Sequence, residues 1–238
     1  MLLGLLGAST LLTASLPLGD LPEQLAQLPL SVVKLLTLIN PIVFLLTAVS
    51  VGTALYDKVN LTVPTISALL KIERPRTSFT EQLKFGVLLG LSAGILIMFI
   101  AFIFERLVPP EEFKALDSSI ELTLLARFGY GGIVEELLLR FGFMTLVVWT
   151  ASKISRRLNN GTYWIGIVLS TLLFAFGHFP IVFVSVPSPS FLLLAYILIG
   201  NSAAGLIFGW LYWKKGLEAA CIAHIFAHAA MVSIESFL

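Results

Sequence analysis

Charged residues are scarce in this chain. Of its 238 residues only 12% are Asp, Glu, Lys or Arg, whereas 58% are hydrophobic and the mean hydropathy is +0.97. Because a soluble domain averages about 25% charged residues, this composition excludes an ordinary soluble protein and indicates a polytopic membrane protein. The net charge of +1 argues against a nucleic-acid-binding surface.

Cysteine is almost absent as well. The single cysteine, Cys221, excludes an internal disulfide and any cysteine-rich metal site. It lies in an apolar segment, so we interpret it as a packing residue rather than a nucleophile. The chain also lacks internal repeats and low-complexity linkers, which predicts one membrane-embedded domain over residues 1–238.

Long apolar stretches are what the chain does have. About 20 such residues are needed to cross the hydrocarbon core of a bilayer. We therefore predict an all-α bundle of about six transmembrane helices, preceded by a short apolar helix within Met1–Leu18 that has no basic flank and is not a typical cleaved signal. The predicted spans are roughly Leu30–Leu55, Lys84–Phe104, Arg127–Ser152, Tyr163–Phe179, Phe191–Trp213 and Leu217–Leu238.

Two of these stretches carry residues with a specific structural meaning. Pro41 is expected to kink the first span without ending it. The second span contains the small residues Gly86, Gly90, Ser92 and Gly94, which suit close contact between membrane helices.

The loops predict the orientation in the membrane. Basic residues gather in alternate loops, so by the positive-inside rule those loops face the cytoplasm. We expect a prokaryotic plasma membrane, with a thylakoid membrane as the alternative. The basic residues are Lys58, Lys71, Arg74, Arg76, Lys153, Arg156, Arg157, Lys214 and Lys215, and the loop before the first span instead carries Asp20 and Glu23.

Three ionisable residues lie inside the third predicted span. A charge near the bilayer centre costs about 3 kcal/mol or more, so such residues usually face an interior cavity and act there. Glu136 and Arg140 are spaced i, i+4 on one helix face and can pair, whereas Glu135 points in another direction. Glu135 is therefore a candidate general base for water. The alternative is a purely structural Glu–Arg pair that clamps two helices.

All three histidines of the chain also lie in apolar segments. His224 and His228 are spaced i, i+4, which allows two imidazoles to bind one metal ion. The motif between them supplies no base, but Glu135 could do so from the third span. His178 ends the fourth span. A single histidine is more often a hydrogen-bonded packing residue, but the three together favour a shared site. For Asn201 we expect an interhelical hydrogen bond.

In sequence order, Glu135-Glu136-x-x-x-Arg140, Phe174-x-x-x-His178 and His224 resemble the motifs of the CPBP family. This family comprises CAAX proteases and bacteriocin-processing enzymes, that is, type II CAAX prenyl endopeptidases and their prokaryotic relatives, also called Abi proteins. The resemblance covers roughly residues 120–236. It implies an intramembrane endopeptidase built from several helices around a conical, water-accessible site, with a peptide or membrane protein as substrate.

The resemblance also implies roles for individual residues. Glu135 would activate the attacking water, His178 would help to position it, and His224 would help to form the site and stabilise the oxyanion.

Further residues would support or modify this site. Glu136 and Arg140 would hold the architecture, and Phe174 would pack behind His178. His228 departs from the pattern, because CAAX-processing members usually carry an asparagine there as an oxyanion donor.

Two mechanisms remain open at this level, a water activated by glutamate alone and a metal-assisted reaction. We favour the second, with zinc bound by His178, His224 and His228 and with Glu135 either as the fourth ligand or as the base.

Two other functions are compatible with the sequence. Buried carboxylates and histidines also relay protons in transporters, although the inverted repeats typical of transporters are not visible. A non-catalytic scaffold or immunity protein of the same fold is the second alternative. The sequence leaves open whether the substrate is prenylated and what the oligomeric state is.

Overall fold

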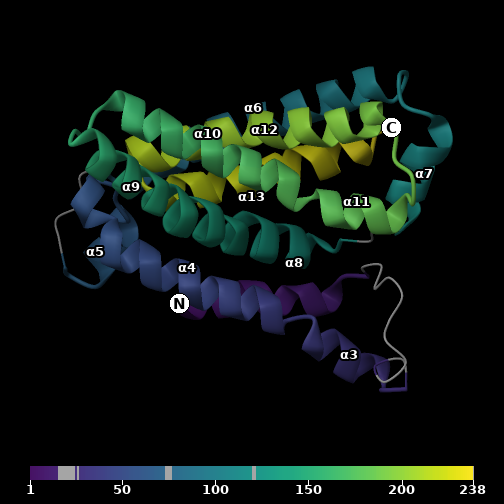
Figure 1. Cartoon of the computed structure of the whole chain (residues 1–238), viewed down its shortest axis with the longest axis horizontal. Helices are drawn as coiled ribbons and strands as arrows, with labels where there is room; N and C mark the ends of the chain where they lie inside the picture. Colours follow the sequence, from purple (N-terminus) through teal and green to yellow (C-terminus); the bar gives the residue numbers. More distant parts are fainter. Residues whose placement is uncertain (16–24, 26, 73–76, 120–121, 238) are drawn as a thin grey trace.

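The computed structural model describes residues 1–237 except 16–24, 26, 73–76 and 120–121 (Figure 1). Its elements are all helices, which confirms the predicted all-α fold. They are α1 Leu2–Ser9, η1 Thr10–Thr13, α3 Leu30–Leu36, α4 Ile39–Leu55, η2 Asp57–Val59, α5 Pro64–Leu69, α6 Phe79–Phe104, α7 Pro110–Ser119, α8 Leu124–Ala126, η3 Arg127–Glu135, η4 Leu137–Met144, α9 Thr145–Ser155, α10 Asn160–Gly177, α11 Phe179–Ser185, α12 Phe191–Lys215 and α13 Leu217–Glu235.

Five helical stretches are long and apolar enough to cross a membrane: Leu30–Leu55, Phe79–Phe104, Asn160–Ser185, Phe191–Lys215 and Leu217–Glu235. They correspond to five of the six predicted spans. The remaining one, predicted at Arg127–Ser152, lies in a helix that runs without interruption over residues 124–155. Of the charges used to predict orientation, Asp20, Glu23, Arg74 and Arg76 lie outside the described residues.

The helix over residues 124–155 differs from the others in its winding. Both η3 and η4 are π-helical, and together they cover most of its first two thirds. A π-helix bonds i to i+5, is rare, and occurs frequently at functional sites. Here Glu135 ends the first π segment, Arg140 lies in the second, and Glu136 lies at the junction between them.

Proline explains two breaks along the spans. Pro41 has no N–H to donate to the carbonyl of Thr37, and its ring crowds that carbonyl. The helix accordingly breaks at residues 37–38, between α3 and α4. Pro180 acts in the same way on the fourth span, where α10 ends at Gly177 and α11 begins at Phe179.

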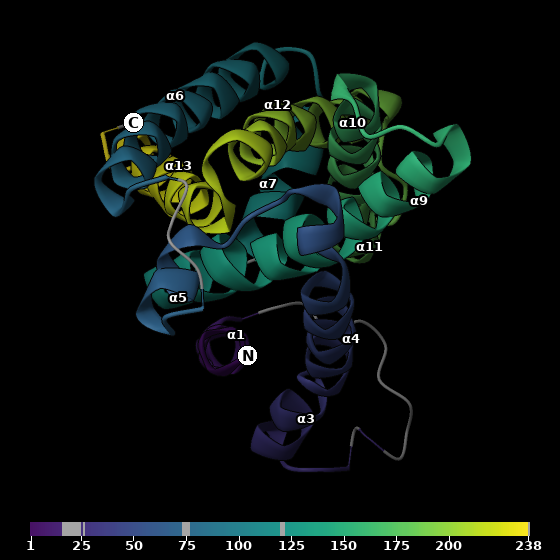
Figure 2. The same cartoon turned by 90° about the vertical axis from the view of Figure 1, so that its left-hand side faces the viewer.

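The main bundle consists of α6, α10, α12, α13 and the helix from α8 to α9, whose axes run roughly along the long axis of Figure 1. The end-on view of Figure 2 shows that α1 and α4 lie on the other side of the α8–α9 helix. That helix is therefore covered by the N-terminal helices on one side and by α13 on the other.

Small residues bring α6 and α13 together. A Cβ atom at Gly90 would lie 2.4 Å from the carbonyl oxygen of Ala223, and one at Gly94 would lie 2.5 Å from that of Ala227. The predicted close contact through these glycines is confirmed. Ser92 was wrongly placed in it, because its side chain is exposed and donates to Leu88 O of its own helix.

Candidate active site

A cavity of about 190 Å³ lies inside the bundle, between the π-helical segments, α10, α12 and α13. Glu135 and all three histidines line it, so the structure brings these four predicted residues to one place. Its remaining walls are mainly apolar and aromatic, with the phenyl rings of Phe174 and Phe208 among them. A second groove of about 510 Å³ shares Glu135, Phe174 and His178 with this cavity.

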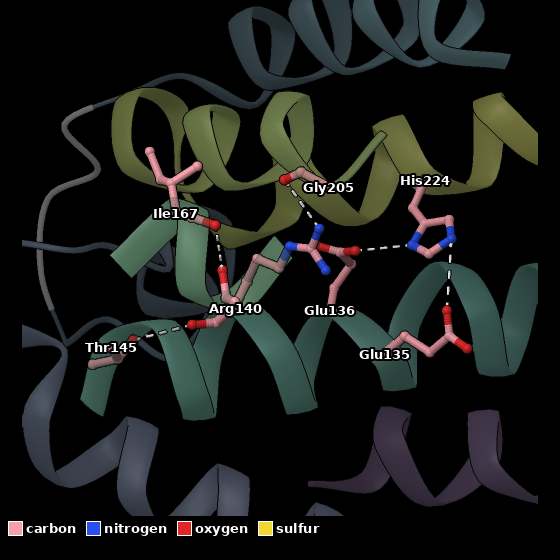
Figure 3. Close-up of polar contacts among 8 residues, drawn as sticks. Glu135, Glu136, Arg140, Thr145, Ile167, Gly205 and His224 are labelled. Carbon is pink, nitrogen blue, oxygen red and sulfur yellow. Dashed lines mark hydrogen bonds and ion pairs between the residues drawn. The ribbon is translucent and has the colours of Figure 1, made fainter. Parts of the chain in front are cut away.

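Below the cavity, Glu136 and Arg140 are sealed from solvent. Both side chains are 0% exposed, and Arg140 Nε lies 3.3 Å from Glu136 Oε2, as the i, i+4 spacing predicts. Arg140 also donates from Nη2 to the carbonyl oxygen of Gly205 in α12, at 3.1 Å (Figure 3). Its guanidinium carbon lies 5.0 Å from the ring centre of Phe174 and 5.6 Å from that of Phe208. The pair thus joins the π-helix to α10 and α12.

His224 connects this buried pair to the cavity. Its Nδ1 lies 2.8 Å from Glu136 Oε1, and because a carboxylate can only accept, Nδ1 carries the proton. Its Nε2 faces Glu135, with 3.8 Å between Nε2 and Oε2 (Figure 3). Phe208 stacks on the imidazole with ring centres 4.7 Å apart. The ring of His224 is therefore fixed on several sides.

Glu135 differs from its neighbour in access. Its side chain is 21% exposed, whereas that of Glu136 is 0% exposed. Consecutive residues of a helix point in different directions, and here one carboxylate reaches the cavity while the other reaches the interior. Glu135 is thus the carboxylate that a substrate or a water molecule can approach.

The end of α10 fixes His178. The backbone N–H of His178 donates to Ala175 O at 3.2 Å, which is an i, i−3 bond. The carbonyl of Phe174 is then available to accept from Nδ1 of the same histidine, at 2.8 Å. The ring of Phe174 meets that of His178 edge to face at 4.9 Å. Nε2 of His178 remains for other partners in the cavity.

His228 lies one turn beyond His224 on α13. The two imidazoles stack nearly parallel, at 5.0 Å and 19°. Nδ1 of His228 is buried and has no hydrogen-bond partner among the described residues. Gly131 allows this arrangement, because a Cβ atom there would lie 2.7 Å from Nε2 of His228.

Zinc binding at this site stays a prediction. Structural and catalytic zinc ions need three or four protein ligands at about 2.0–2.3 Å. In the part of the chain that the structure describes, no three His, Cys, Asp or Glu side chains come together in this way. His224 and His178 each use Nδ1 for a hydrogen bond, to Glu136 and to Phe174 O, so Nε2 is the nitrogen with which either ring could bind a metal ion.

Several contributors were not predicted from the sequence. Gly205 supplies a carbonyl to Arg140, and Phe208 supports both Arg140 and His224. Neither residue has a sequence signal, because both act through a tertiary contact. For Asn201 the expected interhelical bond is wrong: its amide donates to Ile197 O in its own helix, at 2.8 Å, and Asn201 lines the cavity.

These features define the class of the protein: a polytopic, all-α membrane protein with a carboxylate–histidine site enclosed by its helices. Residues 118–230 match the family described as Rce1-like type II CAAX prenyl endopeptidase. This match confirms the resemblance predicted from the motifs, and it includes all seven predicted site residues. No curated protein and no solved structure matches the chain.

Proposed function

We propose that this protein is an intramembrane endopeptidase in which Glu135 activates the attacking water. The observation that carries the proposal is that two adjacent carboxylates lie in different surroundings. Glu135 faces the cavity beside His224, whereas Glu136 is fully buried and bound to Arg140. The family match at residues 118–230 supports an endopeptidase independently of this geometry.

In the proposed reaction, a water molecule in the cavity gives a proton to Glu135 as its oxygen adds to the peptide carbonyl carbon. The carbonyl oxygen then becomes an oxyanion. When the tetrahedral intermediate collapses, the C–N bond breaks and the amine nitrogen takes the proton from Glu135. The carboxylate is thereby restored.

Two histidines have distinct tasks in this proposal. His178 donates from Nδ1 to Phe174 O, so its neutral ring presents the lone pair of Nε2, which can accept from the water and orient it. His224, when protonated, keeps its Nδ1 bond to Glu136 and donates from Nε2 into the cavity. A donor held in place before the reaction stabilises an oxyanion most effectively.

In this proposal His228 also helps to stabilise the oxyanion. Its ring lies parallel to that of His224 and borders the cavity. In the family that the motifs resemble, the asparagine that donates a hydrogen bond to the oxyanion occupies this position. An imidazole N–H can also serve as the donor.

Metal-assisted hydrolysis is the alternative form of the proposal, with zinc near Glu135 and the histidines. Because no three-ligand cluster is assembled among the described residues, we assign the proton transfers to Glu135 and the imidazoles. The two forms are separated by measuring zinc in the purified protein and by assaying cleavage with a chelator.

The decisive experiment compares wild type with Glu135→Gln on a library of membrane peptides, with cleavage products identified by mass spectrometry. Glutamine keeps the shape of the side chain but cannot take a proton. We expect cleavage to fall by about 10²–10⁴-fold, the usual contribution of a general base. Glu111→Gln is the matched control, because Glu111 is exposed on α7, away from the cavity. Equal cleavage by wild type and Glu135→Gln would refute Glu135 as the base, and absence of cleavage by wild type would favour a non-catalytic scaffold.

A further inference from the structure

The two ends of the bundle differ in charge. At one end lie α5, the C-terminal end of α9, and the junction of α12 with α13 (Figure 1). We call this the basic end, and by the positive-inside rule it faces the cytoplasm. Its described basic residues are Lys58, Lys71, Lys84, Lys153, Arg156, Arg157, Lys214 and Lys215.

The opposite end contains α7 and α11 and the start of α8 (Figure 1). Its charges are mixed, and several are paired or used in capping. Arg127 lies 3.6 Å from Glu235, and Glu112 accepts from the backbone and hydroxyl of Ser190. This end has no excess of basic residues in its described part, so it is expected to face away from the cytoplasm.

The cavity at Glu135 extends to this opposite end. Leu122 precedes α8, Arg127 lies at the first turn of the same helix, and Met231 lies one turn before the end of α13; all three line the cavity. From there the cavity reaches inward to Phe208 and His224. Its outer part therefore lies at the end that faces away from the cytoplasm.

Packed side chains separate Glu135 from the basic end. Beyond Glu136 and Arg140, the hydroxyls of Thr145 and Tyr212 bond each other at 2.9 Å, and both residues are 0% exposed. Met144 and Leu211 are also 0% exposed at this level. The helices are thus closed on the cytoplasmic side of the motif.

We infer that substrates reach Glu135 from the side of the membrane opposite the cytoplasm. That the substrate is a peptide rests on the proposed endopeptidase function. The inference restricts this substrate to peptide segments that are exposed at, or enter from, the extracytoplasmic face. A cytoplasmic, lipid-anchored C-terminus would meet the closed end of the bundle.

The test is cysteine labelling in intact cells, which requires no substrate. Cys221→Ala removes the only cysteine of the chain. On that background, Ser118→Cys reports the opposite end and Ser155→Cys reports the basic end; both serines are exposed, which makes them a matched pair. Met231→Cys reports the cavity itself. A membrane-impermeant maleimide is applied before and after permeabilisation.

We expect Ser118→Cys and Met231→Cys to react in intact cells and Ser155→Cys to react only after permeabilisation. The inference is overturned if Met231→Cys reacts only after permeabilisation, together with Ser155→Cys. Peptide N-termini lost from Glu135→Gln cells provide a second readout and are expected to map to extracytoplasmic segments; cytoplasmic positions would also overturn the inference. Absence of Glu135-dependent cleavage would count against the proposed function alone, because the labelling result does not depend on it.

Discussion

At the scale of single residues, we expect Arg140 to contribute strongly to the stability of the fold. It is fully buried, and its charge is matched by Glu136 and by Gly205 O. In Arg140→Met the carboxylate of Glu136 would remain buried without a cation, which costs about 3–5 kcal/mol. We expect a large loss of folded protein and a lower unfolding temperature in detergent.

A double variant isolates the cause of that loss. Glu136→Gln combined with Arg140→Met removes both charges, so no uncompensated ion remains in the interior. The double variant should therefore be more stable than Arg140→Met alone, because replacing a buried pair together is often near neutral. Equal stability of the two variants would mean that the ion pair is not what Arg140 supplies.

His178 allows a similarly sharp test of which nitrogen acts. The amide nitrogen of an asparagine can take the place of Nδ1, which donates to Phe174 O. A glutamine places its polar group near the position of Nε2. If Nε2 orients the water, His178→Gln should keep more cleavage activity than His178→Asn, with both folded as judged by gel filtration and thermal unfolding. The reverse order would assign His178 a purely structural role.

At the scale of elements, the contact between α6 and α13 positions the histidines. Gly90 meets the carbonyl of Ala223, the residue next to His224. Gly90→Ala would force the two helices apart, and overpacking of this kind costs about 1–3 kcal/mol. We expect stability and cleavage to fall together, whereas Ser92→Ala on the exposed side of α6 should match wild type. An unchanged Gly90→Ala protein would show that the helices can separate without loss.

The elements also show what could be predicted from the sequence. The spacing of Gly86, Gly90 and Gly94 predicted a close helix contact because i, i+4 residues share a face. The same spacing could not exclude Ser92, which lies between them in sequence but faces outward. The π winding of η3 and η4 was not predicted, because residue spacing was interpreted with α-helical geometry alone.

At the scale of the whole molecule, features that depend on local sequence patterns could be predicted, whereas tertiary contacts could not. Scarce charge and long apolar runs predicted six spans, and five of them correspond to helices that are long and apolar enough to cross a membrane. The order Glu135, His178, His224 predicted a shared cavity through its resemblance to known motifs. The partners Gly205 and Phe208 could not be predicted, since a backbone carbonyl and a phenyl ring become functional only when helices distant in sequence meet.

The lipid-facing surface leads to the last prediction. Ile95 near the middle of α6 and Phe79 at its start are similarly exposed, at 57% and 55%. Lysine at the centre of a membrane helix costs about 2.5–3.5 kcal/mol on insertion scales, whereas near the helix end it can reach the interface. Ile95→Lys should therefore strongly reduce the fraction of protein resistant to alkaline extraction from membranes. Phe79→Lys should behave like wild type, because it adds a positive charge at the end of the bundle that is already basic. If the same fraction of both variants is extracted, Ile95 does not lie at the centre of the bilayer. The assignment of the basic end to the cytoplasm then loses its support from α6.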